Sequence, residues 1–111
     1  MAIYANISID QGSDFSTEVV VSDSAGNAAD LTGYLVTGQL RKTYTSSTAV
    51  SFVCTITSAI NGTISLALSN STTNDLKAGR YVYDVEIQNG AGGDISRVIE
   101  GQVTVNPGVT R

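Results

Sequence analysis

The sequence has no histidine and no tryptophan, and it has a single cysteine, Cys54, and a single proline, Pro107, among 111 residues. Without histidine the chain lacks the commonest general base and the usual Ser-His and Cys-His catalytic arrangements. One cysteine cannot form an internal disulfide, and without histidine beside it the usual zinc ligand sets cannot be assembled. We therefore expect no enzymatic activity, no cofactor and no metal site.

Charge is also scarce, since only 14% of residues are charged and the net charge is -4. A mildly acidic surface repels nucleic-acid phosphates and anionic lipids, so we expect no nucleic-acid partner and no membrane partner. No apolar run approaches membrane-spanning length, and the N-terminus lacks the pattern of a secretion signal. These absences predict a soluble chain that is made in the cytoplasm and is complete as encoded.

Apolar residues make up 41% of the chain, and Thr, Ser, Val and Ile are abundant, a composition that favours strands. Apolar and polar side chains alternate in segments separated by Gly, Asn, Asp and Ser. No long helix is available to carry parallel crossovers. The pattern predicts an all-β fold, a single antiparallel β-sandwich of about seven strands that forms one domain over residues 1–111. The expected strands are 3–9, 15–21, 34–41, 50–57, 63–68, 80–88 and 95–105.

One face of each alternating segment supplies the expected core. Cys54 falls in such a segment and is expected to act as a small buried hydrophobe, and Gly38 in mid-strand predicts a bulge or a close neighbour. The predicted core consists of Ile7, Val19, Val36, Leu40, Phe52, Ile56, Leu66, Tyr81, Val85, Ile99 and Val103.

Two local motifs interrupt the alternation. Residues 69–78 predict one helical turn, capped by Ser69 or Ser71 and ended at Gly79. Tyr81, which follows that turn, resembles the tyrosine corner of sandwich folds, in which a hydroxyl bonds to upstream backbone.

Exposed tyrosines are the best candidates for binding, because tyrosine is enriched at interfaces. Tyr4 lies on the outward face of the first segment, and Tyr44 lies at a polar hairpin tip together with Thr45 and Ser46. We predict partner contacts at these four residues, with ordinary surface rings as the alternative interpretation.

Carboxylates offer a weaker hypothesis. Asp84 and Glu86 share an outward face about 6.6 Å apart, and a glycosidase pair can have such spacing. A solvated face without a cleft is the preferred interpretation. Aspartates in turns could offer oxygen ligands to calcium, but they lack the spacing of an EF-hand loop. They are Asp10, Asp14, Asp23 and Asp30.

Three stretches together carry a family resemblance: residues 30–34 (DLTGY), residues 39–48 with QLRK and TYTSST, and the pair 78–87 (AGRYVYDVEI) and 97–105 (RVIEGQVTV). This pattern resembles small Ig-like structural proteins of tailed phages, especially those of cyanobacterial and marine hosts. It is also similar to the N-terminal domain of phage baseplate upper proteins, in which a Leu-Thr-Gly segment follows a strand and turn and a Gly-x-Tyr strand comes late.

The resemblance implies an Ig-like β-sandwich and a non-enzymatic virion protein of a tailed phage. Such a subunit decorates or joins parts of the particle, as capsid decoration or cement or as a tail or baseplate component. Its partners would be other virion proteins, and it would be a homo-oligomer or present in many copies. Baseplate upper proteins carry long C-terminal extensions, whereas this chain stops at Arg111, which favours a stand-alone subunit. The alternative is a carbohydrate-binding or adhesin-type Ig-like binding module, for which Tyr4 and Tyr44 are the exposed aromatic candidates.

Overall fold

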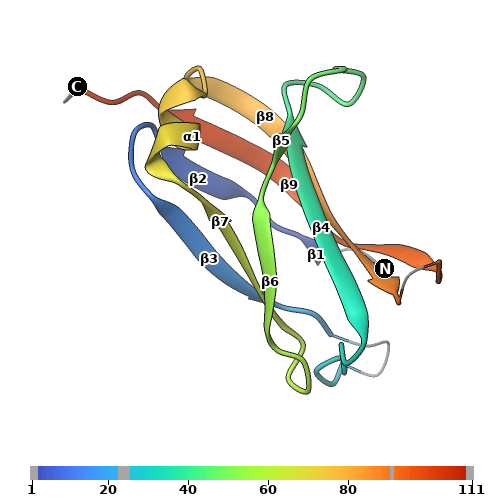
Figure 1. Cartoon of the computed structure of the whole chain (residues 1–111). Coiled ribbons are helices and arrows are strands. Elements are labelled where there is room, and N and C mark those ends of the chain that lie inside the picture. The colour runs from blue at the N-terminus through green and yellow to red at the C-terminus, as the bar shows by residue number, and fades with distance from the viewer. Residues whose placement is uncertain (1–2, 23–25, 91, 110–111) are drawn as a thin grey trace.

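Two β-sheets pack face to face (Figure 1). Their buried apolar side chains form one core cluster. The computed structural model describes residues 3–22, 26–90 and 92–109. This part of the chain forms one short helix and nine strands. The elements are β1 (Ile3–Tyr4), β2 (Ile7–Asp10), β3 (Phe15–Val20), β4 (Tyr34–Arg41), β5 (Val50–Ser51), β6 (Val53–Ser58), β7 (Thr63–Leu68), α1 (Asn70–Asp75), β8 (Gly79–Asn89) and β9 (Ile95–Asn106).

The larger sheet has the strand order β1-β9-β8-β4-β5, and β2 also pairs with β9, while the smaller sheet has the order β3-β7-β6. This arrangement confirms the expected all-β sandwich. The expectation of purely antiparallel pairing is wrong at one place, because β1 and β2 run parallel to β9. A parallel pair needs a long crossover. Here the rest of the sandwich provides that crossover, a connection that alternation within one segment cannot reveal.

The first expected strand is divided into β1 and β2 at residues 5–6 because its backbone comes very close to β9. A Cβ atom built on Gly101 would collide with the carbonyl oxygen of Ala5, so glycine is needed there. The Tyr83 hydroxyl donates a hydrogen bond to the same carbonyl at 2.6 Å. Asn6 Oδ1 accepts from the backbone N–H of Gln102 at 3.1 Å, which keeps the register on both sides of the break.

The fourth expected strand is also divided, at Phe52, where the chain passes from the larger sheet to the smaller one. The Phe52 N–H still donates to the Gly38 carbonyl at 2.9 Å, after which β6 pairs with β7. A Cβ atom on Gly38 would lie 3.3 Å from Cys54 Sγ, so the predicted close neighbour is confirmed. The Phe52 ring packs between Phe15 and Tyr83, with centroid distances of 6.4 and 6.0 Å.

The core follows the predicted face, with differences at the sheet edges. Seven of the predicted residues are buried, namely Leu40, Phe52, Leu66, Tyr81, Val85, Ile99 and Val103. The other four, Ile7, Val19, Val36 and Ile56, are only half-buried and pack against this core. Three of these four lie on β2, β3 or β6, strands at the edge of their sheets, where a side chain has a neighbouring strand on one side only.

The predicted helical turn forms α1, and Ser69 caps it by accepting from the Thr72 N–H at 3.4 Å. The buried Thr73 hydroxyl donates to the Ser13 carbonyl at 2.8 Å, which holds the helix against the β2–β3 turn. The Tyr81 hydroxyl donates to the Lys77 carbonyl at 2.8 Å, so the tyrosine corner is confirmed. Among the residues described, no helix is long and apolar enough to cross a membrane.

Candidate functional site

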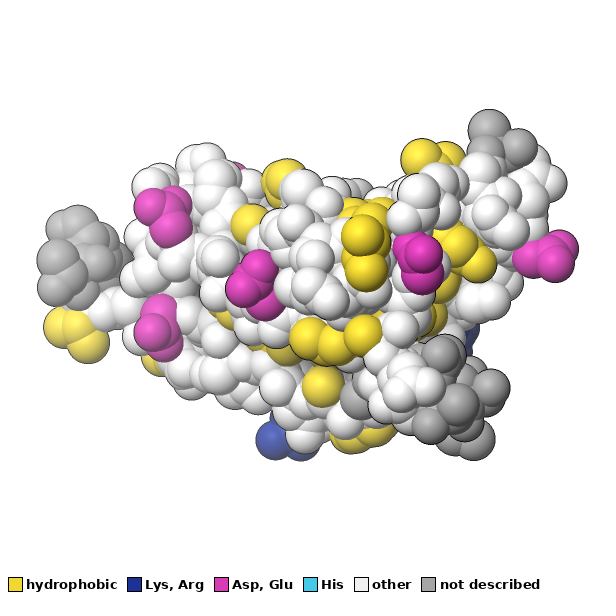
Figure 2. All heavy atoms as spheres, turned by 90° about the horizontal axis from the view of Figure 1, so that it is seen from below, with side chains coloured by type: hydrophobic (Ala, Val, Ile, Leu, Met, Phe, Trp, Pro, Cys, Tyr) yellow, Lys and Arg dark blue, Asp and Glu magenta, His cyan; other side chains and the backbone are white. Residues whose placement is uncertain are grey.

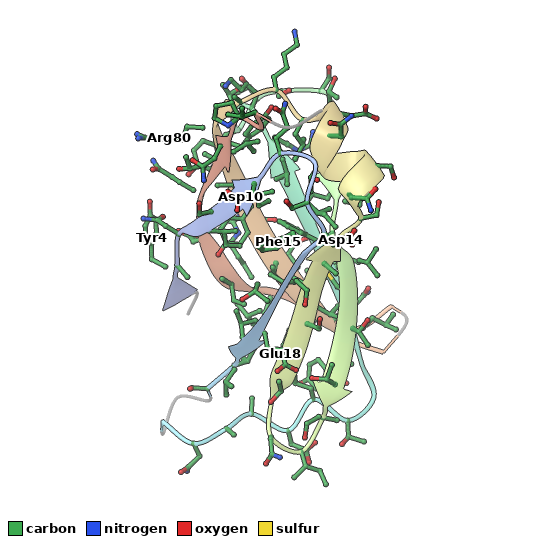
Figure 3. The ribbon with its side chains drawn as sticks, turned by 90° about the vertical axis from the view of Figure 1, so that its left-hand side faces the viewer. Tyr4, Asp10, Asp14, Phe15, Glu18 and Arg80 are labelled. Atoms are coloured by element: carbon green, nitrogen blue, oxygen red, sulfur yellow. The ribbon has the colours of Figure 1, made fainter. Side chains whose placement is uncertain are left out.

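Two of the predicted contact residues, Tyr4 and Tyr44, lie on the same surface, the outer face of the larger sheet. Tyr4 pairs in register with Glu100, which itself lies opposite Asp84 of β8. Figure 3 shows Tyr4 pointing away from the sandwich, whereas Phe15 points between the sheets. Tyr4 is 61% exposed and Tyr44 is 82% exposed. We call this surface, with the 42–49 loop above it, the contact face.

A shallow hollow of about 450 Å³ lies in the contact face over β4, β8 and β9. Its size is within the range of ligand pockets, although it follows an open sheet surface. Val82, Asp84 and Glu86 alternate along β8 in the middle of the hollow, since β8 lies between β4 and β9. The lining residues are Gln39, Arg41, Tyr44, Val82, Tyr83, Asp84, Glu86 and Arg97.

The loop that carries Tyr44 is tied to the sheet by Arg41. Its Nη1 atom donates to the Ser46 carbonyl at 2.6 Å, and its Nη2 atom donates to Gln39 Oε1 at 3.2 Å. Ser46 is half-buried and also donates from its hydroxyl to the Thr48 carbonyl at 3.2 Å. Of the predicted loop contacts, Tyr44 and Thr45 are therefore exposed, while Ser46 serves to fix the loop.

The charged side chains of the contact face are joined by Arg97. Its Nε atom lies 3.3 Å from Asp84 Oδ2, and its Nη1 atom lies 3.3 Å from Glu100 Oε2. The hydrogen bond to Glu100 and then the charge of Asp84 raise the pKa of Arg97. Asp84 and Glu100 are directly opposite on neighbouring strands, a like-charge pair that would be unfavourable without this bridge.

The opposite end of the contact face is apolar. Leu35 and Ile95 lie on either side of Gln88 in register and line a notch of about 100 Å³. They are 51% and 60% exposed. Glu86 lines both this notch and the larger hollow, so the two depressions meet along the sheet. Four of the eight large hydrophobic side chains that are exposed in the described chain thus belong to the contact face.

The edges of both sheets are poor sites for adding another strand. β5 is only two residues long, and the β1–β2 edge is interrupted at residues 5–6. In the smaller sheet, β6 has an irregularity after Ile56, and β3 carries the charged side chain of Glu18. Short strands, bulges and charges are the devices that prevent edge pairing. This leaves faces and loops as the surfaces suited to contacts.

The turn aspartates are used separately and locally. Asp14 Oδ1 accepts from the Asn70 N–H at 2.8 Å, and Asp10 Oδ1 accepts from Asn106 Nδ2 at 3.2 Å. The hydroxyl and N–H of Thr32 donate to Asp30, which lowers the pKa of that carboxyl. Asp23 lies outside the described residues. Within those residues, no three metal-ligating side chains gather into a cluster.

Sequence reasoning did not identify Arg41 and Arg97 as parts of the site. Arg41 could have been found, because strict alternation puts it on the outward side of its strand. Arg97 could not, because the pairing of β8 with β9 shifts register after Val85. Val98 and Ile99 are both buried as a result, and Arg97 lies outward where alternation from Ile99 would place it inward.

Comparison with known proteins supports the fold. No family model matches the chain, and no relative was found among curated proteins. The N-terminal domain of ORF48 from phage TP901-1 is similar in structure, with a TM-score of 0.57 and 16% identity over 92% of this chain and 85% of that one. InlP of Listeria monocytogenes is similar with a TM-score of 0.50 and 19% identity over 95% of this chain, which spans only 28% of the InlP chain. At these identities the likeness concerns the fold alone.

Proposed function

We propose that the chain is a non-enzymatic structural protein of a tailed phage, a small subunit that decorates or joins parts of the particle. The observation that carries this proposal is the likeness to the ORF48 N-terminal domain, which extends over most of both chains. The resemblance of three sequence stretches to virion proteins of tailed phages, including the cyanophage type, supports the same function. Capsid decoration or cement and a tail or baseplate position are both compatible with it.

The contact face is the surface that we propose for binding a neighbouring virion protein. It combines exposed aromatic and aliphatic side chains with hydrogen-bonding groups fixed by Arg41 and Arg97. Interfaces of this kind place apolar anchors among polar groups that are already oriented. Because the sheet edges are guarded, repeated copies in a particle would be joined through this face and the 42–49 loop.

We also propose that the sandwich is of the Ig-like type. If β3, β4, β6, β7, β8 and β9 are read as strands B, C, D, E, F and G, the pairings B-E-D and C-F-G of immunoglobulin domains are present. The confirmed tyrosine corner at Tyr81 supports the same assignment. The first strand differs from the constant type, because it pairs with the last strand.

Locating the protein on purified particles tests the proposed function. Cryo-EM of the particles should show the sandwich at regular positions on the capsid, tail or baseplate. Tyr44→Ala should reduce incorporation, because it removes the most exposed aromatic anchor of the contact face. Ile60→Ala is the matched control, since Ile60 is 75% exposed in the β6–β7 turn, away from that face. Absence of the protein from particles would contradict the proposal.

The second candidate is a carbohydrate-binding or adhesin-type binding module. Two observations favour it: the likeness to part of a bacterial protein, InlP, and a polar hollow with an aromatic ring at its rim. A glycan array separates the two, because a virion joining subunit requires no glycan and a carbohydrate-binding module must give specific signals.

A further inference from the structure

The outward side chains of the larger sheet change in charge along β8. Arg80 lies near the start of the strand, and Asp84 and Glu86 follow further along the same outward face. Arg80 is exposed, and Figure 3 shows it projecting from the same side of the molecule as Tyr4. Arg41 of β4 lies in register between Arg80 and Asp84, so two guanidinium groups stand at one end of the contact face.

The charges of β4, β8 and β9 balance, but they are separated along the strands. These strands carry three arginines and three carboxylates in all. Arg97 lies opposite Glu86 in register. It also bridges Asp84 and Glu100, so this half of the face sums to two negative charges. The two arginines at the other end sum to two positive charges. A neutral face with separated charges does not favour a partner of one sign.

The molecule as a whole shows the same separation. Four of its six Lys and Arg residues lie at the end formed by the 42–49 loop, α1 and the start of β8, together with a smaller number of aspartates. The basic four are Arg41, Lys42, Lys77 and Arg80, and the aspartates described there are Asp10, Asp14 and Asp75. Figure 2 shows the molecule from the other end, where acidic side chains are spread and Lys and Arg are scarce.

Apolar groups on the contact face are separated in the same direction. Tyr44 projects from the loop at the arginine end, where it is 82% exposed. Leu35 and Ile95 line the notch at the carboxylate end, next to Glu86. One end of the face therefore offers an aromatic ring and cations, and the other offers an apolar depression and carboxylates. Each end is complementary to the other but not to itself.

Two copies of this face fit together when their strands run in opposite directions. A two-fold axis that lies between the faces can cross β8 at Tyr83, the residue midway between Arg80 and Glu86. Arg80 of each copy then lies opposite Glu86 of the other copy, which gives two ion pairs. With parallel strands, Arg80 would face Arg80 and Glu86 would face Glu86, and like charges directly opposite are unfavourable.

The same axis also matches the apolar groups. Leu40 pairs with Tyr83 in register, so the axis crosses β4 at Leu40. Tyr44 follows Leu40 by four residues and Leu35 precedes it by five, so the ring of each copy falls near the notch of the other copy. Aromatic rings placed in apolar depressions are typical of the residues that dominate the binding energy of an interface.

We propose that the contact face binds a second copy of this chain as a two-fold dimer, with Arg80 on Glu86 and Tyr44 in the notch between Leu35 and Ile95. This inference deepens the proposed function and rests on it, because it names the neighbour at the contact face as another copy. The contact joins the same patch on both copies and is complete at two. Its footprint is about 26 Å along β8 and about 14 Å across four strands, small for a specific interface, so the dimer is weak and concentration-dependent.

Sedimentation velocity of the purified chain at rising concentrations tests this proposal. The wild-type chain should change from monomer to dimer and form nothing larger, since a two-fold contact leaves no free copy of the patch. A chain that remains monomeric up to about 1 mM would overturn the proposal. Growth beyond two copies would also overturn it, because an exposed sheet edge associates in that way.

Reversal of single charges tests the assigned ion pair. Arg80→Glu and Glu86→Arg should each weaken the dimer about tenfold, because either change replaces two attractive pairs by two repulsive ones. The two variants mixed in equal amounts should associate again as a heterodimer, in which both pairs are attractive. That recovery requires contact between two folded chains, so a folding defect cannot imitate it. Glu18→Arg is the matched control, since it reverses a charge on β3 in the smaller sheet and should leave the dimer unchanged.

The remaining outcomes separate the dimer from the proposed function. Failure of the mixed variants to recover, or an equal loss in Glu18→Arg, would refute the interface. Monomers in solution together with the chain on particles would refute the dimer alone. Dimers of a chain that is absent from particles would refute the proposed function alone.

Discussion

At the scale of single residues, the Tyr83 hydroxyl ties β8 to the break between β1 and β2. It is buried, and it satisfies the Ala5 carbonyl at the point where the first strand is interrupted. Desolvation, with a smaller effect of Tyr4, raises the pKa of Tyr83 to about 12, so the hydroxyl remains a hydrogen-bond donor throughout the physiological range.

Tyr83→Phe should lower the free energy of unfolding by about 1 kcal/mol, because the part-buried carbonyl of Ala5 loses its hydrogen-bond partner. Urea denaturation provides the measurement. Tyr34→Phe is the control, since Tyr34 is half-buried and its hydroxyl makes no hydrogen bond within the described chain. Equal stability of the two variants would mean that water replaces the hydroxyl at no cost.

Cys54 should be an unreactive thiol. Burial raises its pKa to about 11, so at pH 8 the reactive thiolate is nearly absent in the folded protein. Reaction with Ellman's reagent should therefore be slow in native buffer and fast in urea. The unfolded chain releases this proton at lower pH, so the contribution of Cys54 to stability should be fully present below the pKa of the unfolded thiol, about 8.5, and should fall as the pH rises toward 11. Cys54→Ala should flatten that decline.

The sequence predicted which side chains face the core far better than it predicted how fully each side chain is buried. Burial depends on neighbouring strands, and edge positions such as Val19 have only one. The same limit applies to the contact face. Tyr4 and Tyr44 were each predicted as exposed, but their common surface depends on strand order, which no single segment encodes.

At the scale of elements, β9 is the strand on which the larger sheet is organised. It pairs with β8 on one side and with both β1 and β2 on the other. Gly101 makes the pairing of β9 with the first strand possible, because its missing side chain leaves room for the Ala5 carbonyl. Tyr83 lies directly opposite Gly101 on β8, and its ring packs over the glycine. Alternation identified β9, but it could not predict the parallel pairing or the register shift that turns Arg97 outward.

Gly101→Ala should be markedly more destabilising than Gly38→Ala. The new Cβ atom at 101 meets backbone that must move, at a cost of about 1–3 kcal/mol or more. At 38 it meets side-chain and backbone atoms at 3.2–3.3 Å, which small shifts can relieve. Thermal unfolding of both variants checks the order. Reversal of the order would indicate that the β1–β2 segment contributes little to stability.

At the scale of the whole molecule, the edges of both sheets carry features that disfavour pairing with another sheet. Glu18 is the single charged side chain on β3, and it also accepts a hydrogen bond from the Thr57 hydroxyl at 3.2 Å. None of the edge strands carries a lysine, a residue that often blocks edge pairing. Edge pairing is disfavoured instead by the short β5, by the break between β1 and β2, by the irregularity in β6 and by Glu18 on β3.

Glu18→Val should cause concentration-dependent self-association, because it leaves β3 uncharged along its whole length. Sedimentation velocity over a range of concentrations would detect it. Ser65→Val is the matched control, since Ser65 lies directly opposite Glu18 on the central strand β7. That variant adds a similar apolar side chain to the same face without exposing an edge. Association in both variants alike would assign the effect to the sheet face.

The parallel alignment of the first and last strands has a mechanical consequence. If Ile3 and Asn106 were pulled in opposite directions, β1 and β2 would be pulled toward their N-terminal ends while β9 was pulled toward its C-terminal end, so the parallel strands would slide past each other. The backbone hydrogen bonds over 3–10 and 99–106 would then bear the load together in shear. An antiparallel terminal pair pulled from one end would open one bond at a time. A force-extension experiment should therefore show a single high rupture peak, and Tyr83→Phe, which loosens the Ala5 crossing, should lower it.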